Sequence, residues 1–327
     1  MVVARSAVEM GFEFLRQNNG DTDSLSDAWA RGELDLEWEG RSVSVRVVDE
    51  ESKFPLSRLQ QDPSGNDALG EALVRFFENA GLRTGKDARD QFLDWVDSDM
   101  VRRTNGAEGA DYASGRVKDA PMDSLYELRA LPAWADMPYL RSPRQKTSAD
   151  DLGLNGSTSL EGTLDGTLGS SGGAASPTPS PSASAAQASP GISGNSSFGM
   201  DVPKAETQGK GPTSEWDDWM SVNSSGKINV NTAPKELLLC LDDEMTDVLV
   251  EEIDAQRRSN AFANVNDLRN VTGMSNDLLF RIKDYLSVKS QVFEIRAVVK
   301  EYPGRVTLKV LVDRANGELN VVRWEVN

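Results

Sequence analysis

Alternating apolar and polar residues mark both ends of the chain and are absent from its middle. Residues 33–50, ELDLEWEGRSVSVRVVDE, alternate on either side of a Glu-Gly-Arg turn and predict a β-hairpin with one buried face. Alternation returns at 292–301, 306–313 and 321–326, separated by turn residues such as Tyr-Pro-Gly and Ala-Asn-Gly. Two early strands and three late strands can complete one antiparallel sheet.

An amphipathic helix is predicted before the first strands. Residues 3–16 repeat small or apolar side chains at helical spacing, and Asn-Asn-Gly at 18–20 ends the pattern. The chain opens inside this helical pattern, with no capping residue before it. We expect the helix to cover the apolar face of the sheet, which makes the fold class α+β.

The long middle region is predicted to be helical and inserted between the strands. Apolar residues recur at helical spacing in 66–82, 87–99, 123–131, 234–241, 244–259, 265–271 and 275–286. Asn231 or Thr232, followed by Ala233 and Pro234, is a predicted helix start, and the residues from Asn264 to Asp267 offer polar caps. Residues 52–57 resemble 226–231, which indicates two related helical units.

A Ser-, Gly- and Pro-rich segment separates the two helical units. It contains almost no large apolar side chains, so it cannot bury enough surface to offset its ordering entropy, and we expect a disordered tether. The predicted organisation is a helix and first strands at 1–50, the first half of a helical insert at 51–151, the tether at 152–214, the second half at 215–288, and the closing strands at 289–327.

Composition excludes several kinds of chemistry. The 327 residues carry a formal net charge of −17, which disfavours a nucleic-acid surface because phosphates attract lysine and arginine. Histidine is absent, so zinc sites built on histidine and Ser-His or Cys-His nucleophile pairs are excluded. The single cysteine, Cys240, lies in an apolar run and is expected in the core.

Acidic residues surround one loop, within LDWVDSDMVRRTNGAEGADY at 93–112. Asp97 and Asp99 precede the loop, and Glu108 and Asp111 follow it. Carboxylates at short spacing on a loop suit Ca²⁺, which takes six to eight oxygen ligands. The spacing is not that of an EF-hand, and from spacing alone the loop is either a calcium site or a solvated acidic surface.

The second helical unit resembles a helix-hairpin-helix module, so a nucleic-acid-binding protein of the competence type is the alternative function. Such modules grip phosphate through a glycine-containing hairpin. Here the hairpin at 241–245 has no glycine and carries three carboxylates, which favours a packing module. Many acid pairs could be drawn as catalytic, including those of a calcium-dependent hydrolase, but no spacing singles one out.

Several segments together resemble the general secretion pathway protein K family, minor pseudopilins of the type II secretion system. The segments are VVDEESKFPLSRL at 47–59, FLDWVDSDMVRRTNGAEGADY at 92–112, APMDSLYELRAL at 120–131 and GKINVNTAPKELLLCL at 226–241, with the terminal helix and sheet. The resemblance implies a pilin-like helix on an antiparallel sheet, with a helix-hairpin-helix/SAM-like domain inserted between strands. It also implies calcium in the helical domain, at Asp97, Asp99, Glu108 and Asp111.

The resemblance further implies a non-enzymatic subunit at the tip of the type II secretion pseudopilus, supporting protein export in a Gram-negative bacterium. Its expected partners are two other minor pseudopilins, of the I and J types, with contact to secreted substrate or the outer-membrane secretin also open. The expected location is the periplasm, anchored in the inner membrane by a hydrophobic helix upstream of this sequence. Filaments of parallel helices need lateral apolar stripes, so the expected contact surfaces are the N-terminal helix and the neighbouring sheet edge. The expected interface residues on the helix are Ala4, Ala7, Val8 and Gly11, whose small size allows close helix approach. The alternative is that these residues face the chain's own sheet, which we expect for about half of them.

Overall fold

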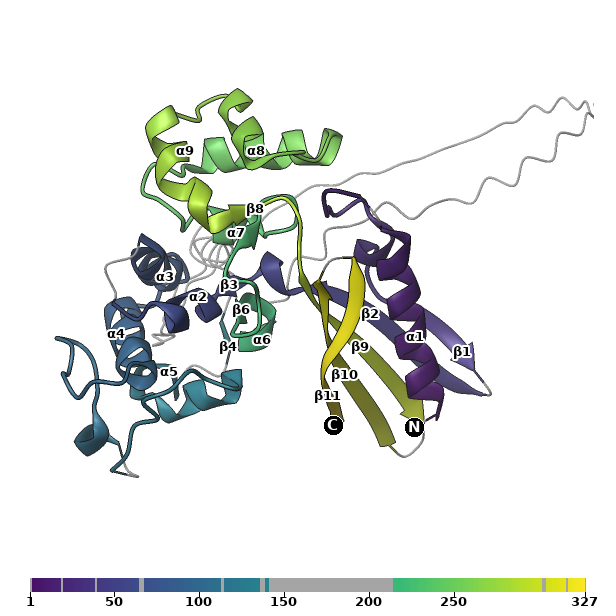
Figure 1. Cartoon of the computed structure of the whole chain (residues 1–327), viewed down its shortest axis with the longest axis horizontal. Helices are drawn as coiled ribbons and strands as arrows, with labels where there is room; N and C mark the ends of the chain where they lie inside the picture. Colours follow the sequence, from purple (N-terminus) through teal and green to yellow (C-terminus); the bar gives the residue numbers. More distant parts are fainter. Residues whose placement is uncertain are drawn as a thin grey trace, which may run out of the picture.

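The computed structural model describes residues 2–18, 20–38, 40–64, 68–112, 115–135, 139–140, 214–301, 304–315 and 317–326. The tether predicted at 152–214 lies outside the described residues, apart from Ser214. Two bodies are visible in Figure 1: one helix on a sheet, which we call the pilin body, and a helical body, which we call the insert.

The pilin body joins both ends of the chain in a single antiparallel sheet. Its strands lie in the order β1-β2-β9-β10-β11, and β2 pairs with β9 through Val43 opposite Val299 and Val47 opposite Ile295. The predicted α+β fold with a shared sheet is therefore confirmed. The strands are β1 (Leu34–Trp38), β2 (Arg41–Asp49), β9 (Val292–Glu301), β10 (Gly304–Ala315) and β11 (Glu318–Val326).

Helix α1 (Val2–Gln17) lies across one face of this sheet (Figure 1). Alternate residues of β2, β9 and β10 point toward it, because side chains on a strand alternate between faces. Trp29, in the short 3₁₀ turn η1 (Ala28–Ala30), closes one end of this core with its ring edge against Phe293 at 5.2 Å between centroids. The described helices include none both long and apolar enough to cross a membrane.

The expected partner interface on α1 needs correction. Ala4, Ala7, Val8 and Gly11 are all buried against the chain's own sheet rather than presented to a neighbour. The physical reason is that small residues allow α1 to approach β9 closely. All four residues lie in this contact, so none of them faces outward. The outward face of α1 carries instead the exposed side chains of Val2, Arg5, Glu9, Glu13, Arg16 and Gln17.

The insert leaves the sheet after β2 and returns before β9. Its α-helices are α2 (Leu56–Gln61), α3 (Ala68–Asn79), α4 (Gly85–Val96), α5 (Pro132–Ala135), α6 (Trp216–Trp219), α7 (Lys235–Leu238), α8 (Asp247–Ser259) and α9 (Asn276–Ile282). Its 3₁₀ turns are η2 (Glu50–Ser52), η3 (Gly109–Asp111), η4 (Leu125–Ala130), η6 (Val265–Asn270) and η7 (Lys283–Tyr285). Its two-residue strands are β3 (Phe54–Pro55), β4 (Tyr139–Leu140), β5 (Ser214–Glu215), β6 (Met220–Ser221), β7 (Ile228–Asn229) and β8 (Leu286–Ser287).

Both halves of the insert share one hydrophobic core rather than forming separate units. Phe77 and Trp134 of the first half pack edge-on at 5.0 Å between ring centroids, and Trp134 meets Trp216 of the second half at 4.9 Å. The short strands β3 and β6 also pair across the two halves, through Phe54 and Met220. The two similar segments around 52–57 and 226–231 therefore contribute to a single packed body.

Helix starts in the insert follow the sequence signals only in part. Asn264 and Asp267 form a reciprocal capping box at η6, which confirms that prediction. The start predicted at Asn231 or Thr232 is wrong, because α7 begins at Lys235 and neither side chain caps it. The Thr232 hydroxyl instead donates to Asp49 at the end of β2 at 2.6 Å, a contact between the insert and the sheet that a local sequence pattern cannot show.

Candidate functional site

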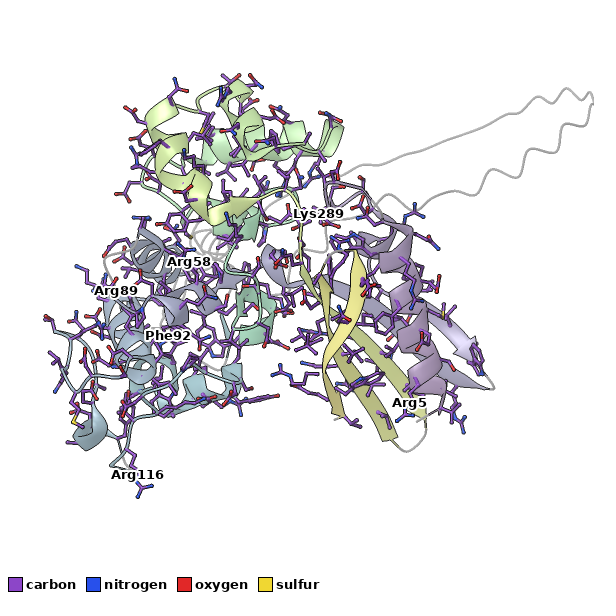
Figure 2. The ribbon with its side chains drawn as sticks, in the orientation of Figure 1. Arg5, Arg58, Arg89, Phe92, Arg116 and Lys289 are labelled. Atoms are coloured by element: carbon purple, nitrogen blue, oxygen red, sulfur yellow. The ribbon has the colours of Figure 1, made fainter. Side chains whose placement is uncertain are left out.

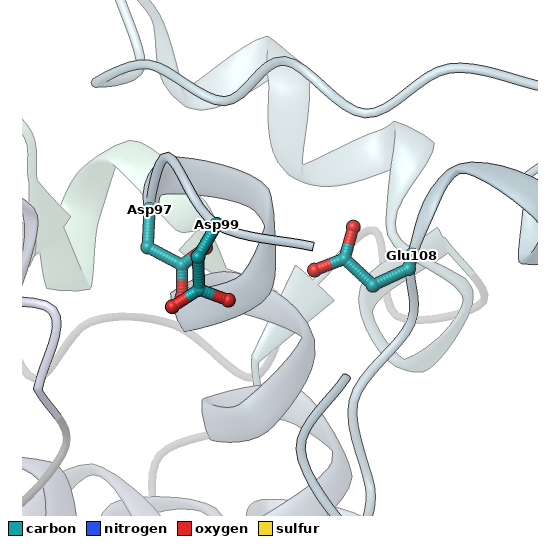
Figure 3. A group of neighbouring side chains, drawn as sticks. All are labelled: Asp97, Asp99 and Glu108. Atoms are coloured by element: carbon teal, nitrogen blue, oxygen red, sulfur yellow. The ribbon is translucent and has the colours of Figure 1, made fainter. Parts of the chain in front are cut away.

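The acidic loop begins where helix α4 ends. The amide of Asp97 closes the last turn by donating to the Leu93 carbonyl at 3.0 Å, and the chain then leaves the helix in an extended conformation. In Figure 3, Asp97 and Asp99 project from one side of the loop and Glu108 from the other. One carboxylate oxygen from each of the three lies within 4.8 Å of the others. The structure therefore brings together three of the four predicted metal ligands.

Two oxygens of this cluster lack the partners that burial normally requires. Oδ1 of Asp97 and Oε1 of Glu108 are buried and accept no hydrogen bond from the described residues. A buried acceptor left without a donor costs free energy, more so when the group is charged. Converging orphaned oxygens from separate parts of a loop suit a bound cation, so these residues fit calcium.

Electrostatics favour the same interpretation. Burial raises the pKa of Glu108, and the nearby carboxylates of Asp94, Asp97, Asp119 and Asp99 raise it further. Carboxylates that repel one another in a partly buried site are stabilised by a divalent cation, which reverses that repulsion.

Asp111 lies outside the cluster and supports it from behind. Its Oδ2 accepts the Glu108 amide at 2.9 Å, and its own amide donates back to the Glu108 side chain, so the two form a capping box at η3. Its Oδ1 accepts from Arg102 at 3.4 Å. Asp111 thus positions Glu108 and is not one of the three clustered carboxylates, which belong to Asp97, Asp99 and Glu108.

Arg103 and Asp94 organise the loop beneath the cluster. Asp94 is fully buried on α4 and accepts from the Arg103 guanidinium at 2.6 Å. The same guanidinium pairs with Oδ2 of Asp97 and donates to the Pro63 carbonyl at 2.6 Å. Arg103 therefore engages one oxygen of Asp97 and leaves the other, Oδ1, without a hydrogen bond from the described residues.

Gly106 explains how the loop passes so close to Asp94. A β-carbon at position 106 would lie 1.8 Å from Oδ2 of Asp94, so any side chain there collides with the buried carboxylate. Sequence reasoning missed Arg103 and Gly106, although a glycine inside an acidic loop is a usable signal of close backbone approach. Three carboxylates without histidine or cysteine form a hard-oxygen donor set, which calcium can complete with carbonyl oxygens and water.

The helix-hairpin-helix-like half of the insert does not present a phosphate cradle at the hairpin 241–245. Arg281 donates to Asp242 at 2.8 Å and to Glu244 at 2.7 Å, and this pairing lowers the pKa of Asp242. Arg75 reaches the Leu241 carbonyl at 3.0 Å from α3. The hairpin is therefore held by the chain's own arginines, which supports the packing role predicted from its composition.

The pilin body with a helical insert defines a pilin-like subunit, and comparisons with known proteins give the family. Two family models, each described as type II secretion system (T2SS), protein K, match residues 52–142 and 228–289. The chain belongs to the type II secretion system protein K family, whose members are minor pseudopilins; this confirms the resemblance found in the sequence.

A solved structure shows the same fold. The chain is similar to one chain of the crystal structure of the GspK-GspI-GspJ complex from the enterotoxigenic Escherichia coli type 2 secretion system. The TM-score is 0.63 at 14% sequence identity, with 99% of this chain and 94% of that chain covered. No curated protein matches the sequence significantly.

Proposed function

We propose that this protein is a non-enzymatic assembly subunit that forms the tip of a type II secretion pseudopilus and supports protein export across the outer membrane. It would do so by packing with two other minor pseudopilins, of the I and J types. Membership of the protein K family supports this proposal, as does the similar fold found in a GspK-GspI-GspJ complex. The proposed location is the periplasm, with an upstream hydrophobic helix in the inner membrane.

The placement of the insert supports the proposed position at the tip. The insert joins the pilin body at the end of the sheet where α1 ends. At that end the Asp23 amide, in the loop after α1, donates a hydrogen bond to the Val288 carbonyl of the returning crossover at 2.9 Å. Figure 1 shows the N-terminus of α1 at the opposite end of that body. A subunit stacking beyond the C-terminal end of α1 would meet the insert, which ends growth in that direction.

The exposed edges of the pilin body supply surfaces for the partners. Trp324 on β11 lies opposite Val310 on β10 in the strand register. Trp38 on β1 lies opposite Arg41 on β2 and points to the same face of the sheet as Leu36. Both tryptophans are 45% exposed and lie on the face that α1 covers only at its centre. Exposed aromatic side chains beside a helix are typical anchors of a protein interface. We propose that the partners contact these edges together with the outward face of α1.

Calcium would serve this function by ordering the loop after α4. Asp97, Asp99 and Glu108 would bind the ion, and Asp111 would hold Glu108 in place. The loop lies in the part of the insert far from the sheet, on the side where Figure 2 labels Arg116. Its proposed role is therefore to stabilise the insert rather than to bridge the two bodies.

Size-exclusion chromatography tests the proposal. The purified chain is mixed with the soluble domains of its I-type and J-type pseudopilins, and the expected result is one earlier peak that contains all three. Separate elution of the three proteins at micromolar concentration would overturn the assembly role. A mixture with an unrelated pilin domain serves as the control.

A further inference from the structure

Buried polar side chains fill the junction between the pilin body and the insert. Two crossovers meet there, residues 49–53 leaving the sheet and residues 287–292 returning to it, beside the loop that follows α1. In Figure 2, Lys289 marks this place, between the two bodies. The buried charged side chains of the junction include Asp23, Asp49, Glu50, Glu51, Lys53 and Arg314.

Glu51 connects three segments that are remote in sequence. Its side chain is fully buried. One carboxyl oxygen accepts the amide of Ser225 in the insert at 3.0 Å, and the other accepts the amide of Val292, the first residue of β9, at 3.1 Å. Glu51 itself belongs to the outgoing crossover. It therefore fixes the second half of the insert against the start of the central strand.

Asp49 makes a parallel set of contacts two residues earlier. Its Oδ2 accepts from the Thr232 hydroxyl at 2.6 Å and from the Ser290 hydroxyl at 2.8 Å. Its Oδ1 accepts the Glu51 amide at 2.8 Å. Asp49 and Glu51 together therefore connect the insert, the returning crossover and the sheet at this end of the junction. Asp217 of α6 adds a second connection, through ion pairs with Arg296 of β9 at 3.1 Å and Lys309 of β10 at 2.9 Å.

Charges around this pair do not balance. Arg314, at the end of β10, pairs with Asp23, and Lys53 pairs with Glu50, which also accepts from the Ser221 hydroxyl at 2.5 Å. On its far side, Lys53 also lies near Asp217 and Glu294. Neither Asp49 nor Glu51 forms an ion pair with a lysine or arginine of the described residues.

Two adjacent buried carboxyls without a cation cannot both be charged cheaply. Burial, followed by the charge of Asp49, raises the pKa of Glu51 to about 8. Burial also raises the pKa of Asp49 to about 6, with a smaller contribution from Asp23. The hydrogen bonds that each carboxyl accepts act in the opposite direction and do not overcome burial.

We propose that Asp49 and Glu51 form a protonation-dependent latch that sets the orientation of the insert on the pilin body. A proton on Glu51 keeps the junction closed. Loss of that proton places two like charges in a buried site, and the insert then separates from the start of β9. The orientation of the insert becomes a function of pH.

Distance measurement by double electron–electron resonance tests the latch. Spin labels are attached through Glu9→Cys on α1 and Val248→Cys on α8, both exposed, in a Cys240→Ser background. The expected distance distribution is narrow at pH 6 and broad at pH 9.5, with a midpoint near pH 8. Glu51→Gln keeps a neutral side chain and should stay narrow at both pH values. The matched control Glu252→Gln, at an exposed position on α8, should titrate like the parent.

A distribution that is unchanged from pH 6 to pH 9.5 in the parent would overturn the latch, as would a Glu51→Gln variant that titrates like the parent. Asp49→Asn provides a second test if Glu51→Gln does not fold. Removing the neighbouring charge should move the midpoint below pH 8. A midpoint unaltered by Asp49→Asn would also contradict the proposal.

Discussion

Gly11 of α1 lies so close to Ile295 of β9 that a β-carbon at position 11 would sit 2.5 Å from the Cγ2 atom of Ile295. The contact joins the first helix to a strand from the last part of the chain. It sets the distance between helix and sheet, because a β-branched side chain has few rotamers with which to move away. Glycine at position 11 is therefore required by packing.

Gly11→Val should destabilise the pilin body by about 1–3 kcal/mol, the usual cost of overpacking a core. The new side chain must push α1 away from β9. Urea denaturation followed by circular dichroism measures the change in the free energy of unfolding. Glu9→Val, on the exposed face of the same helix, is the matched control and should change stability far less. Equal stability of Gly11→Val and the parent would contradict the described packing.

Calcium should raise the melting temperature of the chain relative to a chelator-treated sample. At 100 times the dissociation constant, binding to the folded state adds about 2.7 kcal/mol. The paired change Asp97→Ala and Asp99→Ala should abolish the calcium-dependent shift, measured by differential scanning fluorimetry. Asp284→Ala, at an exposed position on η7, should keep it. A parent protein that melts identically with calcium and with chelator would exclude the site.

Gly106→Ala should disrupt the loop even though it removes no ligand. The added methyl collides with Asp94, which holds Arg103 and through it one oxygen of Asp97. Both the melting temperature and the calcium response should fall. Gly20→Ala is the control, because its added β-carbon meets no atom closer than 3.4 Å. An unchanged calcium response in Gly106→Ala would show that Asp94 does not organise the site.

The free energy of unfolding should depend on the protonation of Glu51. Its pKa is raised in the folded state from 4.5 to about 8, so the folded state holds the proton more tightly than the unfolded chain. The resulting stability is fully present below pH 4.5 and is lost as the pH rises through 8. The difference in unfolding free energy between the parent and Glu51→Gln, measured in urea from pH 5 to pH 9, should therefore change with pH. A constant difference would contradict the raised pKa.

Trp324→Ala should weaken the complex with the partner pseudopilins by about 10-fold or more, which corresponds to about 1.4 kcal/mol. The indole is exposed on the edge strand, so its loss should leave folding nearly unchanged. Isothermal titration calorimetry measures the affinity. Phe280→Ala, an exposed aromatic on α9 of the insert, is the control. Equal weakening by both variants would contradict an interface on the sheet edge.

The sheet could be predicted from sequence because one of its faces is covered. Apolar and polar residues alternate strictly in strands with one covered face, so β2, β9 and β10 are recognisable in the sequence. Grouping them required only that early and late strands share a sheet. The direction of the small residues on α1 could not be predicted in the same way. A stripe such as Ala4, Ala7 and Gly11 permits close approach to any surface, and spacing does not say whether the surface belongs to a partner or to the chain itself.

The sequence predicted which acidic residues gather at the candidate metal site, but it did not predict how they are arranged. Asp97, Asp99 and Glu108 converge as their spacing suggested, whereas Asp111 turns to the Glu108 amide. Arg103 was not foreseen, because its partner Asp94 lies a helical turn before the loop and the pairing exists only once the loop folds back. Long-range polar contacts, like the one that diverts Thr232 to Asp49, leave no local periodic signal.

Site-specific photo-crosslinking measures most directly whether the pilin body is the assembly surface. A photoreactive amino acid replaces Glu9 on the outward face of α1 or, in a separate protein, Glu252 on α8 of the insert. With both partner pseudopilins present, mass spectrometry should find crosslinks to a partner from position 9 and none from position 252. Crosslinks from position 252 alone would contradict assembly through the helix and sheet.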